Sequence, residues 1–210
     1  MNQKILTMAV CGAVATGALA DPHVFTIYAQ APATALPGES ITVEIWGQVQ
    51  SPQWVQGTSM IAGFGIDVLG TGEISNVEMG QISEWAAGFG INGFVQGFNV
   101  VGTSGGQLHD GHWGDCWIGD CEGDRGNPIL LFTILATAGE WGEMVFTPGN
   151  PNINGGLSFY PSWDDGLSII GPNDAGTSLV LLSATVLIVP GPGVLVGSVL
   201  GLALMARRKR

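Results

Sequence analysis

Apolar and polar residues alternate with a period of two along much of the middle of the chain. The stretch from 41 to 49 shows this best, and its predicted core residues are Ile41, Val43, Ile45 and Val49. Similar short stretches, bounded by Gly, Pro, Asn and Asp, lie at 24–30, 60–69, 93–101, 129–137, 142–147, 156–160, 167–170 and 178–189. No segment between them has a convincing helical period. The pattern predicts an all-β fold, a single sandwich of two packed sheets with about nine strands.

The residues between these stretches favour turns. The chain holds 34 Gly and 11 Pro, and only 11% of its residues are charged, so long solvated helices should be scarce. Asn92-Gly93 and Asn154-Gly155 predict turns with positive φ, and the run from Pro148 to Pro151 is predicted to end a strand.

The first twenty residues have the three parts of a signal peptide. Lys4 gives a positive start, residues 5–14 form an apolar run, and Ala18-Leu19-Ala20 supplies the small residues of a cleavage site. We therefore expect an exported protein whose first residue is Asp21.

The other end of the chain also has three parts. Val189-Pro190-Gly191-Pro192 precedes an uncharged apolar run, and the chain closes on Arg207-Arg208-Lys209-Arg210. The apolar run is short for a membrane-spanning helix, which usually needs about 20 residues. Its basic end fits the cytoplasmic side of a membrane, with the acidic domain outside.

This tail resembles the PEP-CTERM sorting signal of Gram-negative bacteria. The resemblance implies processing by an exosortase, a membrane transpeptidase that removes the tail and passes the protein to the cell surface or to extracellular polysaccharide. Gly191 stands where the family motif usually has Glu. The predicted organisation is a signal peptide at 1–20, a β-sandwich at 21–189 and a sorting tail at 190–210 that either anchors the protein permanently in the membrane or is removed.

Charge is distributed very unevenly. All 17 Asp and Glu lie between Asp21 and Val189, where Arg125 is the one Lys or Arg, so the exported part carries a formal charge of about −16. Such a charge repels phosphate backbones and anionic lipid headgroups. It excludes nucleic acid as a partner and makes divalent cations the natural counterions.

Residues 35–43, with the sequence ALPGESITV, contain a Pro-Gly-acid turn that leads into an alternating strand. This segment resembles the opening of cohesin-like sandwiches, and residues 127–134 and 179–189 are similar to later strands of that group. The resemblance implies a sandwich of the cohesin-like or jelly-roll type and a surface-protein partner of the dockerin kind.

The densest polar stretch, 108–127, is predicted to be one long exposed loop. Cys116 and Cys121 are the two cysteines of the exported chain, which predicts a disulfide that closes a small hairpin. A zinc site that adds His109 and His112 is an alternative, with an unusually compact ligand spacing.

The same stretch could bind calcium through oxygen ligands. Its candidate ligands are Asp115, Asp120 and Asp124. An EF-hand is excluded because Arg125 stands where that loop needs Gly. Apart from calcium, no cofactor is predicted.

The seven tryptophans raise the question of sugar binding. Trp46 falls on the polar face of its strand, and Trp54, Trp113, Trp117 and Trp163 have polar, loop-like surroundings in which exposed rings could stack on sugars. Trp113 and Trp117, beside the predicted disulfide, are the ligand candidates. Trp85 and Trp141 are predicted to be half-buried residues of the sandwich.

Two segments match enzyme motifs. Residues 102–106 fit G-x-S-x-G and residues 88–93 fit G-x-G-x-x-G, but neither opens a helix as those motifs require. We therefore predict a non-catalytic, secreted or cell-surface protein of the extracellular matrix. A carbohydrate-binding module is the alternative, and a secreted hydrolase that uses paired carboxylates such as Glu140 and Glu143 is the third hypothesis.

Overall fold

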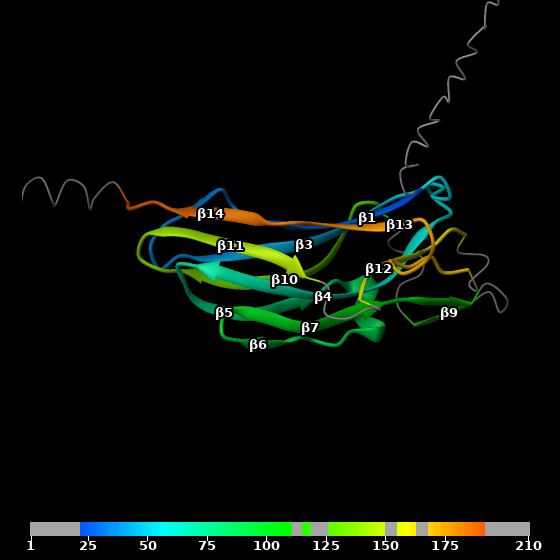
Figure 1. Cartoon of the computed structure of the whole chain (residues 1–210). Coiled ribbons are helices and arrows are strands. Elements are labelled where there is room, and N and C mark those ends of the chain that lie inside the picture. Colours follow the sequence, from blue (N-terminus) through cyan, green and yellow to red (C-terminus); the bar gives the residue numbers. More distant parts are fainter. Residues whose placement is uncertain (1–21, 111–114, 119–125, 150–154, 163–167, 192–210) are drawn as a thin grey trace, which may run out of the picture.

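In the computed structural model, the described residues are 22–110, 115–118, 126–149, 155–162 and 168–191. They form two packed β-sheets, which confirms the predicted all-β sandwich (Figure 1). Sheet A has the order β13 (Thr177–Leu182), β1 (His23–Gln30), β3 (Ser40–Gln50), β10 (Ile129–Ala138) and β5 (Ile74–Ile82). Sheet B has the order β2 (Thr34–Ala35), β14 (Ala184–Ile188), β11 (Gly142–Gly149), β4 (Met60–Gly72), β7 (Asn99–Gly106) and β6 (Phe94–Gln96), and β12 (Gly156–Tyr160) also pairs with β4. A hairpin of β8 (Leu108–Asp110) and β9 (Asp115–Ile118) and a 3-10 helix, η1 (Glu84–Phe89), complete the described elements.

The core lies between the two sheets. The predicted core residues of β3 are confirmed, since Ile41, Val43, Ile45 and Val49 are 4%, 0%, 0% and 2% exposed. Phe64 of sheet B stacks on Phe132 of sheet A, with ring centroids 5.7 Å apart. Because burial of one large apolar side chain contributes about 1.5–3 kcal/mol, the packed inner faces stabilise the fold.

The predicted strand 178–189 is in fact two strands in different sheets. β13 pairs in parallel with β1 in sheet A, whereas β14 pairs antiparallel with β11 in sheet B. The chain changes sheet at Ser183, which belongs to neither strand. Both halves are apolar, so the hydrophobic pattern alone does not reveal the break.

The predicted strand 93–101 is also divided. It contains β6 and the start of β7, which form a hairpin. The positive φ of this turn falls on Gly97, at 64°, and the predicted positive φ at Gly93 is wrong. Near the second predicted turn, Asn154 lies outside the described residues, and Gly156 has a positive φ of 110°.

Pro148 continues a strand, contrary to the sequence prediction. It lies in β11 and pairs with Val68 of β4. The pairing of β14 with β11 ends at Phe146. Pro148, which has no backbone N–H, therefore does not interrupt the hydrogen bonds between β11 and β14.

Five elements lie where the sequence predicted none, namely β2, β5, η1, β8 and β9. β5 pairs with β10 through two register shifts, and these irregularities break its alternation of apolar and polar residues. β8 and β9 occupy residues 108–110 and 115–118, so the prediction of one long loop at 108–127 is wrong for this part. For the predicted strand 167–170, Leu167 lies outside the described residues, and Ile170 forms an isolated bridge with Phe159.

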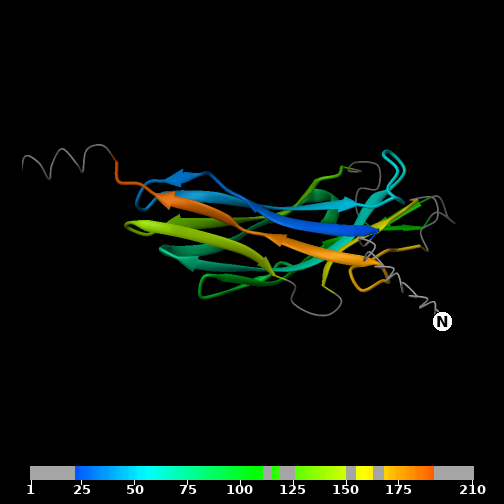
Figure 2. The same cartoon turned by 45° about the horizontal axis from the view of Figure 1, so that its top comes forward.

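The described chain enters and leaves the sandwich at opposite tips. Figures 1 and 2 both place the start of β1 near the tip that carries β9, and the end of β14 at the other tip. Pairing agrees with this view, because His23 lies opposite Thr177 while Ile188 lies opposite Ala35. From Thr177 to Ile188 the chain therefore runs along the molecule for about 40 Å, at roughly 3.3 Å per residue.

Candidate binding surfaces

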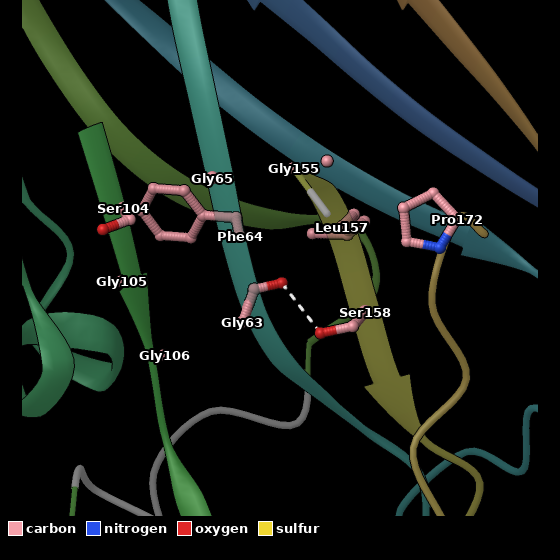
Figure 3. A pocket seen from close by; sticks show the side chains of 11 residues that line it. Gly63, Phe64, Gly65, Ser104, Gly105, Gly106, Gly155, Leu157, Ser158 and Pro172 are labelled. Carbon is pink, nitrogen blue, oxygen red and sulfur yellow. Dashed lines mark hydrogen bonds between the residues drawn. The ribbon is translucent and has the colours of Figure 1, made fainter. Parts of the chain in front are cut away.

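A groove of about 650 Å³ crosses the outer face of sheet B (Figure 3). Figure 3 shows that its walls come from β4, β7, β12 and the segment that contains Pro172. Its lining residues are Gly63, Phe64, Gly65, Ser104, Gly105, Gly106, Gly155, Gly156, Leu157, Ser158 and Pro172. We call this the glycine groove, because six of its eleven lining residues are glycines.

The glycines follow from how closely β4 and β7 approach each other. A Cβ atom on Gly63 would lie 3.0 Å from the carbonyl oxygen of Gly105, and one on Gly106 would lie 2.7 Å from that of Ala62. Larger residues would push the strands apart, so the groove exposes backbone in place of side chains. The one hydrogen bond drawn in Figure 3 is donated by the Ser158 hydroxyl to the Gly63 carbonyl, at 3.3 Å.

Ser104, the central residue of the G-x-S-x-G match, lies inside β7. Its backbone N–H and C=O pair with Ile91 at 3.1 and 2.9 Å, and its Cα lies opposite Gly65 of β4. This is regular strand geometry, whereas a nucleophile elbow needs a sharp strand-to-helix turn. The described lining of the glycine groove contains no ionisable side chain, so it offers contact with a ligand and no acid–base chemistry.

A second surface lies on the outer face of sheet A. The strand register places Leu182 opposite Tyr28, Tyr28 opposite Trp46, and Trp46 opposite Leu130. These four residues form one row across β13, β1, β3 and β10, which we call the aromatic row. Leu182 is 50% exposed, and the other three are partly exposed. Burial raises the pKa of the Tyr28 phenol above its ordinary value of 10.0.

Polar groups lie beside the aromatic row. The indole N–H of Trp46 donates a hydrogen bond of 2.9 Å to the carboxylate of Glu44, two residues earlier on the same face of β3. Glu44 in turn lines a depression of about 340 Å³, whose other lining residues are Gln30, Ala31, Pro32 and Thr42. The aromatic row and this polar depression therefore adjoin at Glu44.

The segment where the tail begins is partly described. The backbone N–H of Val189 donates to the carbonyl of Ala35 at 2.9 Å, beyond the last paired residue of β14. Val189 is 40% exposed and Pro190 is exposed. The rest of the predicted sorting motif, Pro192 and the basic residues 207–210, lies outside the described residues, as do the signal peptide and its cleavage site.

Most of the predicted loop sites lie outside the described residues as well. This applies to Trp113, Cys121, Asp120 and Asp124, while Asp115, Cys116 and Trp117 are described only as backbone positions of β9. The disulfide, the metal sites and the ligand role of Trp113 and Trp117 therefore stay predictions. Where the structure is described, no three His, Cys, Asp or Glu side chains gather as metal ligands would. Within the same ranges there is no helix with the length and apolarity that crossing a membrane requires.

The described tryptophans differ from one another in burial. Trp85 is only 3% exposed and donates its indole N–H to the Leu130 carbonyl at 2.8 Å, so it is buried more deeply than predicted. Trp141 is 72% exposed beside the β10–β11 turn, so the prediction that it is half-buried is wrong. Trp54 is half-buried, and its ring centroid lies 5.6 Å from that of Phe159.

Comparison with known proteins gives only a structural likeness. No protein-family model and no curated protein matches the sequence. The second type II cohesin module of the cellulosomal adaptor ScaA scaffoldin of Acetivibrio cellulolyticus is 10% identical, with a TM-score of 0.46 over 78% of this chain and 96% of that one. A cohesin module from a Clostridium perfringens family 33 glycoside hydrolase is 10% identical, with a TM-score of 0.43 over 80% and 98% of the two chains. Because the identities are about 10% and the TM-scores are below 0.5, we assign the sandwich fold from the strand order of this chain alone. We also do not infer a ligand of this chain from those of the cohesin modules.

Proposed function

We propose that this protein is an exported, non-catalytic component of the cell surface or extracellular matrix. In this proposal residues 21–189 form a binding domain, and a PEP-CTERM-like tail at 190–210 brings the protein to an exosortase-type enzyme. A secreted hydrolase is the competing hypothesis.

The main support is the position of the predicted sorting motif relative to the fold. The hydrogen bond from Val189 to Ala35 is the last one of the sheet B edge, and the motif begins at this residue. Removal of everything after Val189 would therefore leave every described strand in place. A processing enzyme needs such a boundary, because a cut inside β14 would remove core residues.

In this proposal, the same geometry would also orient the domain relative to the membrane. The tail leaves at one tip, so the tip that carries β9 would point away from the membrane, about 40 Å further out at roughly 3.3 Å per residue. Both outer faces of the sandwich would then stand clear of the membrane. The acidic charge of the domain supports this orientation, since anionic headgroups repel it.

Intact mass and terminal sequencing of the native protein test the proposal. The protein is recovered from its producer, separately from membrane and extracellular fractions. We expect an extracellular chain that starts at Asp21 and ends near Val189. A chain that still ends at Arg210 in the membrane would make the tail a plain anchor, and a cytoplasmic chain that starts at Met1 would refute export.

The competing hydrolase hypothesis needs a separate measurement. The purified protein is incubated with a panel of polysaccharides, and reducing ends are counted. We expect no turnover. Turnover that a single carboxylate substitution abolishes would favour the hydrolase.

A further inference from the structure

The aromatic row has the properties of a preformed binding platform. Cross-strand neighbours on one face of a sheet have Cβ atoms about 5 Å apart, so Tyr28 and Trp46 are neighbouring side chains on the outer face. Both rings are partly buried, and each is held between neighbours in the row. Rigid rings of this kind supply a large contact area and lose little conformational entropy on binding.

Glu44 fixes the orientation of one ring. Its carboxylate accepts the indole N–H of Trp46 at 2.9 Å, and a carboxylate can accept several hydrogen bonds at once. Glu44 therefore has acceptor capacity left for a ligand. In the adjoining depression, Gln30 supplies an amide and Thr42 a hydroxyl. An apolar platform thus lies next to a small set of donors and acceptors, as in sites for polyhydroxylated ligands.

Charge selects among such ligands. The described outward side chains of β1 and β3 are neutral apart from Glu44, and no Lys or Arg lies between residues 22 and 110. With a formal charge of about −16 on the exported part, an acidic polymer would be repelled from this face. A neutral ligand with many hydroxyl groups meets no such penalty.

We propose that the outer face of sheet A binds a neutral polysaccharide. The apolar faces of successive sugar rings stack on Trp46 and Tyr28, and sugar hydroxyls bond with Glu44, Gln30 and Thr42. Leu130 and Leu182 extend the apolar contact at either end of the row. The proposal names a partner for the binding domain and rests on its proposed export, because a matrix polysaccharide lies outside the cell.

Binding is measured with the full chain, purified in mild detergent, against insoluble cellulose and chitin and soluble β-glucan, mannan, galactan and xylan. Polygalacturonate and heparin serve as acidic controls. We expect retention on at least one neutral polysaccharide and on neither acidic one. Trp46→Ala and Tyr28→Ala should each weaken it about tenfold, the loss of one stacked ring. Trp141→Ala removes an equally large ring beyond the end of β10 that is opposite to Leu130, and should change binding less than about twofold.

A second measurement does not depend on whether Trp46→Ala folds, because it uses the unmutated chain and needs only the conservative variant Trp46→Phe for assignment. In the unmutated chain, the indole N–H resonance of Trp46, assigned by its loss in Trp46→Phe, should shift when the retained polysaccharide is added. Binding to no neutral polysaccharide, preferential binding to an acidic one, or an equal loss in Trp141→Ala would overturn the proposal. So would an unshifted Trp46 resonance at saturation. Any of these results leaves the termini and location of the native protein unaffected, so failure of this proposal is distinguishable from failure of export.

Discussion

Ending the chain after Ser183 should strongly destabilise the sandwich, whereas ending it after Val189 should leave its stability unchanged. The shorter chain lacks β14, whose Val186 and Ile188 are 0% and 5% exposed. Loss of these two buried side chains costs about 3–6 kcal/mol at roughly 1.5–3 kcal/mol each. The loss of β14 also uncovers the edge of β11 along five paired residues. Single domains have only about 5–15 kcal/mol of stability, so most of it would be lost.

The two chains are compared by urea unfolding, followed by tryptophan fluorescence. With a slope of about 2 kcal/mol per molar urea, the midpoint of the shorter chain should fall by about 2 M or more. The chain that ends at Val189 keeps the hydrogen bond to Ala35 and should unfold at the midpoint of the full chain. Equal midpoints for both truncations would show that β14 is not part of the cooperative core. A large loss in the longer chain would show that a cut at the motif damages the domain.

Three further predictions concern the sandwich itself. Asn127→Ala should lower the free energy of unfolding by about 2–4 kcal/mol in urea unfolding, because its side chain accepts from the N–H and donates to the C=O of the buried residue Val49, at 2.9 and 2.7 Å. Gly72→Ala should cost about 2 kcal/mol more than Gly38→Ala by the same assay: both have positive φ, but only at Gly72 would the new Cβ strike a carbonyl oxygen of β11. The pKa of Tyr28 is higher in the folded chain than in the unfolded chain, so the unfolded chain loses the phenol proton at a lower pH. The free energy of unfolding should therefore fall as the pH rises above about 10. This part of the fall should be absent in Tyr28→Phe.

The sequence predicts strands best where one face is buried and the register is regular. The period of two at 41–49 identified β3 and its core residues, because one face of β3 is buried and its register with β1 has no shift. β5 was missed because its pairing with β10 shifts register twice, so apolar residues do not recur at a fixed interval. The change of sheet at Ser183 was missed because apolar residues continue on both sides of it.

The candidate surfaces show the same limit. Alternation along β3 was enough to place Trp46 on the outer face, and alternation along β1 places Tyr28 on the face opposite Phe25 and Ile27. Only the strand order and the register show that Tyr28 and Trp46 are neighbours, and these depend on pairing between residues that are far apart in the sequence. The glycine groove is harder still to predict, because Gly63 and Gly106 come from different strands and acquire meaning only when those strands pair.

The arrangement of these features would let the proposed sorting and the proposed binding operate without interfering. The predicted cut lies beyond Val189 at one tip, while the aromatic row crosses sheet A on its flank. β13, which contributes Leu182 to that row, is separated from the tip by the whole of β14. Cleavage of the tail should therefore leave polysaccharide affinity unchanged, and the chain that ends at Val189 should bind as tightly as the full chain. A difference greater than about threefold between them would mean that the tail, and not the aromatic row, contributes to the binding site.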